Sequence, residues 1–251
     1  MTQPLRTATP AIDKAIAVFD YLSKNSGATF TDIFQGANLP KSTASSLLTS
    51  LVAHGLLRQE KNKFYLGVRL YEYGKVVEDV FDIKRFSEIP LGKLRDNTGL
   101  TCHLGVLEGA AAVYLLKMES PGAIVVRSWV GKRLSLYSSG LGKALLAWLS
   151  DSQIDALLPQ QEFEQRTSTT LPNKTALKAE LALIKQRGWA FDNQEDSEGV
   201  FCIAAPIFDP HDNVIAAISA SGVSFQVTQE SVPDIVKQII STSQEISQQI
   251  I

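Results

Sequence analysis

The sequence predicts an α+β protein with two dissimilar parts, an N-terminal winged helix-turn-helix and a larger C-terminal domain of mixed strands and helices. Three helical apolar stripes within residues 11–52 and a basic hairpin pattern within residues 56–66 predict the first part. Short strand-like runs between helical segments after Pro90 predict the second part. With 251 residues, 45% of them hydrophobic, the chain can form a core in each part. We expect the winged helix-turn-helix over 1–66, a linker helix over 67–81 and the C-terminal domain over 82–251.

The first two helices have clear boundary signals. Apolar residues at helical spacing predict a helix over residues 11–24. A second helix should begin near Thr29, because Thr29 and Asp32 have the spacing of a capping box, which satisfies the free N–H groups of a first turn. Residues 36–39 form the turn, and Pro40 ends the second helix and opens the third.

The third helix has one buried stripe and one small, polar, acid-free face. The stripe is Ala44, Leu47, Leu48, Leu51 and Val52, and the residues expected at DNA are Lys41, Ser42, Thr43, Ser45 and Ser46. A helix that enters the major groove needs such a face, because acids repel phosphates and bulky side chains prevent close approach. A solvated face of any helical domain would look the same, so this face alone leaves DNA binding open.

A basic hairpin follows the third helix. Residues 56–58 and 64–66 are predicted as strands around the turn 60–63, in which Asn62 tolerates the left-handed conformation. Arg58, Lys61 and Lys63 can then lie along the phosphate backbone. The hairpin and the acid-free helix face together favour DNA binding.

The charge distribution supports this division of the chain. Residues 1–75 hold nine Lys and Arg against five Asp and Glu, a net of +4, whereas residues 76–251 hold fifteen against twenty-one, a net of −6. Only the first part is suited to phosphate. Because a net of +4 neutralises few phosphates, we expect the protein to bind DNA as a dimer or higher oligomer.

Several classes of protein are disfavoured. No run approaches the roughly 18 apolar residues of a membrane span, and residues 1–6 lack the apolar stretch of a signal peptide, so we expect a cytoplasmic protein. Cys102 and Cys202 do not form a disulfide framework and are interpreted as small buried apolar residues. The histidines do not have the spacing to cysteines that zinc sites show. A metal site formed by Cys102, His103, Cys202 and His211 is the less favoured alternative to buried cysteines. We therefore expect neither a metal nor a cofactor.

The C-terminal part is predicted to be a sensor domain. Strands are predicted over 104–107, 112–116, 124–126, 189–191, 200–205 and 214–219, and helices over 140–149, 174–187 and the apolar-striped end of the chain. Residues 137–144 resemble a phosphate loop, but Tyr137 and Ala144 replace its required Gly and Ser/Thr. No nucleophile elbow is present, so no enzyme is predicted.

Motifs along most of the chain resemble those of one family. Residues 39–43, Leu-Pro-Lys-Ser-Thr, followed by a Leu-Leu helix, resemble the DNA-binding helix of the IclR family of bacterial transcription regulators. Residues 138–147 resemble its first ligand-domain motif, 187–192 with 198–209 its second and 216–222 its third. The resemblance implies a GAF-like effector-binding domain, a homodimer or homotetramer, and a small organic acid that changes binding to double-stranded operator DNA.

The resemblance also implies the effector site. It assigns polar contacts to Asp192, Cys202, Ser219 and Ser221, a carboxylate contact to the amides of Gly140 and Leu141, and apolar walls to Ala123, Val126, Leu134 and Val200. A helix that begins at Gly140 offers free N–H groups to an anion. Ser219 and Ser221 are two apart on a strand and share a face, although two small residues packed under a helix would show the same spacing. This set contains no Lys or Arg.

The function predicted is a ligand-responsive transcriptional regulator, specifically a repressor of a catabolic operon. The alternative is a small-molecule enzyme or sensor built on the C-terminal domain with a non-functional DNA-binding module. One departure from the family concerns Ser45 and Ser46, where larger side chains are common. Serines contact bases less selectively than Arg, so operator choice is expected to depend on the wing or on DNA shape.

Overall fold

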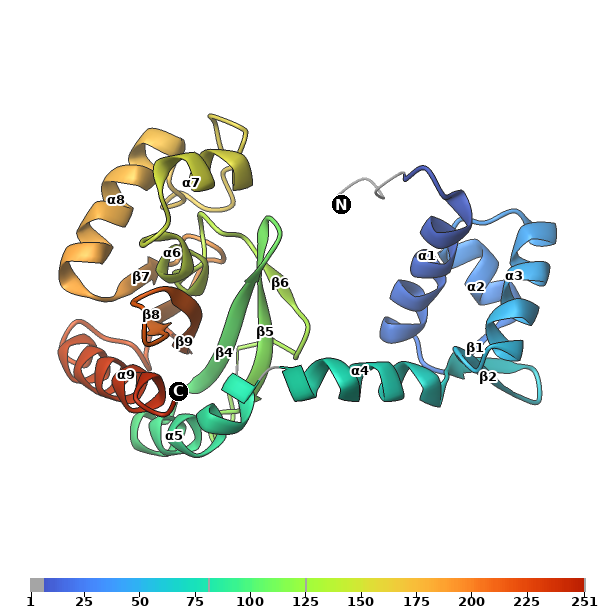
Figure 1. Cartoon of the computed structure of the whole chain (residues 1–251), viewed down its shortest axis with the longest axis horizontal. Coiled ribbons are helices and arrows are strands. Elements are labelled where there is room, and N and C mark those ends of the chain that lie inside the picture. The colour runs from blue at the N-terminus through green and yellow to red at the C-terminus, as the bar shows by residue number, and fades with distance from the viewer. Residues whose placement is uncertain (1–6, 81, 125, 251) are drawn as a thin grey trace. The chain divides into compact units, whose positions relative to one another are not determined.

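The computed structural model describes residues 7–80, 82–124 and 126–250, with the side chains of 77–80 and 82 left undescribed. Phe81, the last residue of the predicted linker, lies outside the described residues. The chain divides into two compact units, 1–81 and 82–251 (Figure 1). Within the described part of the chain, no helix is long and apolar enough to cross a membrane.

The N-terminal unit is a three-helix core with a small sheet. Its elements are α1 (Pro10–Lys24), β1 (Ala28–Thr29), α2 (Phe30–Gly36), α3 (Lys41–Ala53), β2 (Leu57–Glu60) and β3 (Lys63–Leu66). Val18, Leu22, Ile33, Leu48 and Leu57 pack together as its centre. The predicted capping box is confirmed: Thr29 Oγ1 accepts the Asp32 N–H, and the Asp32 carboxylate accepts the Thr29 N–H at 2.9 Å.

The wing differs from the prediction in its turn. Strands β2 and β3 pair from Leu57↔Leu66 to Glu60↔Lys63, which leaves Lys61 and Asn62 as a two-residue turn. Lys61, not Asn62, takes the left-handed conformation, with φ of 55°. The strand pairing fixes which turn position needs positive φ, and this register overrides the preference of Asn for that conformation. β1 adds a third strand, in the order β1-β3-β2, and two residues carry too little periodicity to predict it.

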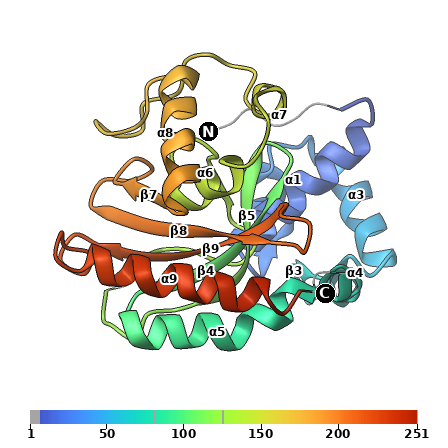
Figure 2. The same ribbon diagram turned by 60° about the vertical axis from the view of Figure 1, so that its left-hand side comes forward.

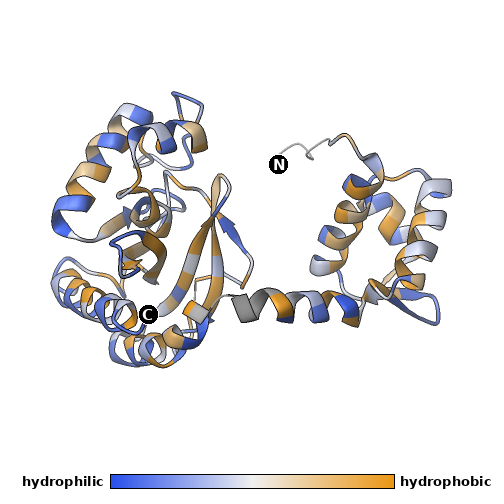
Figure 3. Ribbon diagram, viewed as in Figure 1, coloured by the Kyte–Doolittle hydropathy of each residue, from blue (hydrophilic) through white to orange (hydrophobic). Residues whose placement is uncertain are grey.

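Helix α4 (Val68–Val80) follows the wing and confirms a helix within the predicted linker. Its described side chains Val68, Tyr71 and Val76 are each 67% exposed. On α1, Ile12 and Ile16 are also at least half exposed. Helices α1 and α4 therefore carry large apolar side chains on the surface of a small unit. The hairpin between β2 and β3, in contrast, is hydrophilic (Figure 3).

The C-terminal unit is a six-stranded antiparallel sheet between helices. In chain order its elements are α5 (Asp82–Thr98), β4 (Thr101–Glu108), β5 (Ala111–Met118), β6 (Arg133–Leu134), α6 (Gly140–Leu146), α7 (Asp151–Leu157), α8 (Lys174–Arg187), β7 (Ala190–Asn193), β8 (Val200–Phe208), β9 (Val214–Val223) and α9 (Val232–Ser247). The strand order is β6-β5-β4-β9-β8-β7. Helices α5 and α9 lie side by side against one face, and α6 packs on the other with α8 above it (Figure 2). The α+β prediction is therefore confirmed.

Three features of this unit differ from the sequence predictions. The predicted strand 124–126 is wrong: the described residues Ile124 and Val126 are in no strand, because β6 takes the free edge of β5 through Ala112↔Leu134. The helix predicted over 140–149 ends at Leu146. Helix α5, whose pattern is interrupted by an internal proline, and the short helix α7 were not predicted from the sequence.

Candidate nucleic-acid interface and ligand pocket

The acid-free face of α3 is exposed as predicted from its spacing. Lys41, Ser42, Ser45 and Ser46 are exposed, and Thr43 is half-buried. Ser46 Oγ donates to the Thr43 carbonyl at 3.1 Å. A serine hydroxyl bonded in this way keeps its oxygen lone pairs available as acceptors, so this face can meet donors on base edges.

The three predicted cations of the wing have different surroundings. Lys61 and Lys63 are exposed at the tip of the hairpin. Arg58 forms an ion pair with Glu60, and its guanidinium stacks 4.3 Å from the centre of the Tyr65 ring. Arg58 is thereby held along the hairpin, and Glu60 competes with phosphate for it.

A pocket of about 230 Å³ lies in the C-terminal unit beside the start of α6. Seven residues predicted at the effector site line it: Val126, Leu134, Leu141, Asp192, Val200, Cys202 and Ser221. The structure thus brings together side chains from β6, α6, β7, β8, β9 and the segment before β6. Ala123 is exposed and does not line the pocket.

Gly140 and Ser219 lie next to the pocket without lining it. A Cβ on Gly140 would lie 2.9 Å from the Cys202 carbonyl oxygen, so the lack of a side chain lets α6 begin directly against β8. Ser139 Oγ caps α6 by accepting the Gly142 N–H at 3.0 Å, rather than that of Gly140 or Leu141. Ser219 is fully buried on β9, two residues before Ser221.

The pocket floor is set by strand register. Cys202 on β8 lies opposite Ser221 on β9, and Ser221 lies opposite Thr101 on β4. One row further along, Ser219 lies opposite His103. Cross-strand partners share a face of the sheet, so these two rows of polar side chains are adjacent on the face that carries α6.

Buried acids give the pocket unusual electrostatics. Burial raises the pKa of Asp192 to about 7, while its Oδ1 accepts the Glu195 N–H at 2.6 Å. Glu195 pairs with Lys143, an α6 side chain that is only 1% exposed and whose Nζ donates to the Phe191 carbonyl at 2.6 Å. Burial also raises the pKa of Cys202 to about 12, so Cys202 is a thiol at neutral pH.

The pocket contains cations that the sequence analysis missed. Arg127 and Lys132 line it, which corrects the prediction that no Lys or Arg belongs to the site. Both lie between β5 and β6 in a segment with no regular structure, so no periodicity indicated their direction. Tyr114 also lines the pocket, and it could have been found, because it lies on a predicted strand whose alternation fixes its face.

Asp196 is a further lining residue that sequence reasoning missed. Its Oδ1 accepts from Ser138 Oγ at 2.9 Å and from Arg166 at 3.0 Å. The site therefore has two acids, but Asp196 is already neutralised by a cation from outside the lining.

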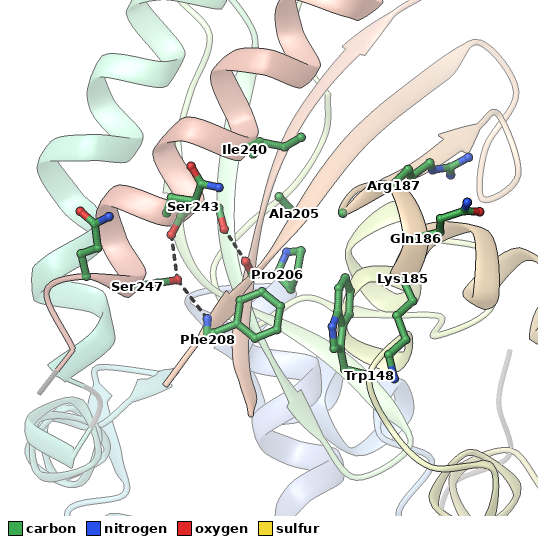
Figure 4. A pocket seen from close by; sticks show the side chains of 13 residues that line it. Trp148, Lys185, Gln186, Arg187, Ala205, Pro206, Phe208, Ile240, Ser243 and Ser247 are labelled. Carbon is green, nitrogen blue, oxygen red and sulfur yellow. Dashed lines mark hydrogen bonds between the residues drawn. The ribbon is translucent and has the colours of Figure 1, made fainter. Parts of the chain in front are cut away.

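A larger pocket of about 420 Å³ lies elsewhere in the same unit, between the end of α8, β8 and α9 (Figure 4). Trp148 and Phe208 meet edge to face in it, with ring centres 5.2 Å apart. Its serines are used within the fold, since Ser243 Oγ donates to the Pro206 carbonyl and Ser247 Oγ accepts the Phe208 N–H at 3.0 Å. None of the predicted effector residues lines this pocket.

A winged helix-turn-helix and a separate domain with a small polar pocket define a class of protein, the DNA-binding regulator that carries its own sensor domain. Comparison with known proteins identifies the family. The model of the bacterial transcriptional regulator IclR C-terminal domain matches residues 75–248, and that of the IclR helix-turn-helix domain matches residues 11–61. The chain belongs to the IclR family of bacterial transcriptional regulators, as its motifs predicted.

Full-length relatives agree with this assignment. The chain is 36% identical over 239 residues to the uncharacterised HTH-type transcriptional regulator RhmR of Escherichia coli K12, covering 95% of this chain and 92% of that protein. It is 27% identical over 251 residues to the acetate operon repressor of Salmonella typhimurium, covering 98% and 92%. The crystal structure of the Thermotoga maritima IclR is similar at a TM-score of 0.80 and 30% identity, covering 96% and 98%.

Proposed function

We propose that this regulator represses a catabolic operon and that a small hydroxylated organic acid in the pocket beside α6 relieves the repression. The observation that carries the proposal is the pocket itself, where polar side chains and two cations surround a volume of about 230 Å³. This volume suits a small ligand. The Salmonella relative is named as the repressor of an acetate operon, which supports both the sign of regulation and the metabolic setting.

The ligand class follows from the charges around the pocket. The backbone N–H groups of Gly140 and Leu141 at the start of α6 and the Lys132 ammonium are suited to a carboxylate. Ser221 offers a hydroxyl on the pocket floor. Asp192 repels an anion unless it is protonated or accepts a ligand hydroxyl, which favours a hydroxy acid over a plain fatty acid.

For the DNA, we assign Lys41, Arg58, Lys61 and Lys63 to phosphates and Ser42, Thr43, Ser45 and Ser46 to base edges. The exposure of α3 and the wing tip supports the assignment. The domains proposed are 1–66 for DNA, 67–81 for the linker and 82–251 for the effector, and the division into units 1–81 and 82–251 supports the last boundary. A regulator of this kind acts at the chromosome, so we place it in the cytoplasm.

We propose a homodimer or homotetramer. The exposed apolar side chains of α1 and α4, among them Ile12, Ile16, Val68, Tyr71 and Val76, support an interface on the DNA-binding unit, because large exposed apolar side chains favour burial against a second copy. A non-enzymatic role is part of the same proposal. His103 Nε2 lies 2.8 Å from Ser128 Oγ, but burial lowers the pKa of His103 to about 3, which makes it a poor general base.

The test is operator binding by the purified full-length protein. Footprinting on the DNA upstream of its own gene, with and without lactate, gluconate or mandelate, should show a near-palindromic protected site that is released by at least one acid. Light scattering should give a dimer or tetramer. Absence of a footprint would contradict the DNA-binding role, and a footprint unaffected by every acid would contradict the proposed ligand class.

A further inference from the structure

Two polar atoms beside the pocket have no hydrogen-bond partner among the residues that the structure describes, His103 Nδ1 and Ser219 Oγ. Both residues are fully buried. Polar atoms buried without a partner are rare, because each loses its hydrogen bonds to water and gains nothing in return. His103 and Ser219 are direct partners across β4 and β9, so the two atoms belong to one location on the sheet.

This location continues the floor of the pocket. The His103 ring stacks on Tyr114, with ring centres 4.0 Å apart and planes 14° from parallel, and Tyr114 lines the pocket. Ser219 is adjacent to Ser221 on the same face of β9, and Ser221 lines the pocket as well. The two unpartnered atoms therefore lie one row along the sheet from Ser221, in an inner row formed by His103 and Ser219.

The hydrogen bonds around His103 determine what Nδ1 can do. Ser128 Oγ donates to the Val126 carbonyl at 3.3 Å, and a serine hydroxyl has only one hydrogen to donate. We infer that Ser128 Oγ keeps this donation and accepts from His103 Nε2 at 2.8 Å. The proton of a neutral His103 is then on Nε2, which leaves Nδ1 as an acceptor.

His103 stays neutral under ordinary conditions. Burial, together with the nearby Lys117 and Lys132 ammonium groups, lowers the pKa of its imidazole to about 3. Lys117 also donates from Nζ to the Ser128 carbonyl at 3.1 Å, which holds the same segment in place. The inner row thus offers one acceptor, Nδ1, and one hydroxyl, Ser219 Oγ, whose polar neighbour among the described residues is the weakly bonding thiol of Cys202.

We propose that His103 and Ser219 form the inner end of the effector pocket and select acids whose hydroxyl group donates a hydrogen bond to His103 Nδ1. The inference rests on the proposed function, since it assumes that this pocket binds the acid, and it requires protonated Asp192, because a single ligand hydroxyl cannot donate to both Asp192 and His103. It adds a reason for selectivity: a keto group has no hydrogen to donate to Nδ1, and a deoxy acid leaves the atom unpaired. The pocket should therefore rank hydroxy acids above both.

The test uses matched acids and calorimetry on the full-length protein. Two series differ only at one carbon: lactate, propionate and pyruvate, and mandelate, phenylacetate and phenylglyoxylate. The parent should bind the hydroxy member of at least one series most tightly. His103→Phe keeps an aromatic ring against Tyr114 and should reduce that preference by about 3- to 10-fold, the effect of one hydrogen bond. His211→Phe, the same exchange at an exposed turn, should leave it unchanged.

Different failures have different meanings. If His103→Phe folds and keeps the full hydroxyl preference, the inner row is not a selectivity element, whereas the proposed function stands. If the parent binds all three members of each series equally, both the inner row and the proposed preference for hydroxy acids are wrong. If no acid binds, the proposed ligand class is wrong. Ser219→Ala removes the second unpartnered atom without adding bulk and should lower the affinity for the hydroxy member in the same way.

Nitrogen-detected NMR gives a readout that does not depend on the folding of a variant. His103 should show an unprotonated Nδ1 and a protonated Nε2 in the free protein. The Nδ1 signal should move on addition of the hydroxy acid and not on addition of its deoxy counterpart. A protonated Nδ1 in the free protein, or a signal that responds to both acids alike, would overturn the assignment.

Discussion

Asp192 is an acid that is 4% exposed in a pocket proposed to receive an anion. Burial raises its pKa from 3.8 to about 7, so its charge changes near neutral pH. A raised pKa in the folded state means that the protonated form is favoured by folding. The contribution of Asp192 to stability is therefore fully present below pH 3.8 and is lost as the pH rises through about 7.

The same shift predicts pH-dependent effector binding. An anionic ligand favours protonated Asp192, so its affinity should rise as the pH falls from 8 towards 6, by at most about tenfold per pH unit for one proton taken up. Asp192→Asn should flatten this dependence in calorimetry with lactate or mandelate. A profile that is equally steep in Asp192→Asn would show that another group takes up the proton.

Lys63 tests the wing at the residue scale. Lys63→Ala should weaken binding to all DNA sequences alike and reduce the slope of log affinity against log salt by about one unit, because one phosphate contact is lost. Lys185→Ala, which removes an exposed lysine from α8, is the matched control and should leave the slope unchanged. An unchanged slope in Lys63→Ala, measured by fluorescence anisotropy, would mean that the wing assignment is wrong.

At the element scale, the start of α6 connects the fold to the site. Gly140→Ala places a Cβ 2.9 Å from the Cys202 carbonyl, so α6 must shift away from β8. We expect weaker acid binding and a lower melting temperature. Gly92→Ala in α5 meets no atom within 4 Å and should instead stabilise the protein by up to about 1 kcal/mol through helix propensity. Calorimetric melting of both variants compares the effects, and equal stabilisation would contradict the packing argument.

Elements with local signals were predictable from the sequence. The Thr29 capping box and Pro40 fixed the helix starts, alternation marks the buried face of β5, and the spacing of two between Ser219 and Ser221 placed both on one face of β9. Elements whose pattern is broken or short were not: α5 contains Pro90, and β6 has two residues. Their existence depends on tertiary packing, which no local pattern encodes.

The residues of the candidate site also fall into a predicted group and a group that the sequence did not indicate. Residues with family motifs, such as Asp192, Cys202 and Ser221, were found from sequence and meet in one pocket. Arg127 and Lys132 were missed because their segment is irregular. His103 was noticed only as a poor metal ligand, since its neighbours across β4, β5 and β9 appear only when the strands are paired.

At the scale of the whole molecule, the opposite net charges of the two parts of the chain predict which part contacts DNA and which binds the effector. The basic part, 1–75, carries a net of +4 and is expected to meet phosphate, while the acidic remainder carries a net of −6 and is proposed to bind the effector. Control of DNA binding by an acid therefore requires coupling between two units. Allosteric coupling typically amounts to about 1–3 kcal/mol, and it acts in both directions.

A double substitution on the pocket floor tests this coupling. Ser219→Ala with Ser221→Ala should abolish the effect of the acid on operator binding and leave DNA binding without the acid intact, because both side chains are far from the DNA-binding unit in sequence and are buried in the other unit. Loss of DNA binding without the acid would indicate a folding defect rather than uncoupling. An unaltered acid response would place the pocket elsewhere.

The most direct measurement is operator affinity by fluorescence anisotropy, with and without a saturating hydroxy acid that calorimetry has shown to bind. We predict that the acid weakens operator binding by about 5- to 150-fold in the parent protein and has no effect in the Ser219→Ala and Ser221→Ala double variant. An acid that occupies the pocket and leaves operator affinity unchanged in the parent would contradict the account.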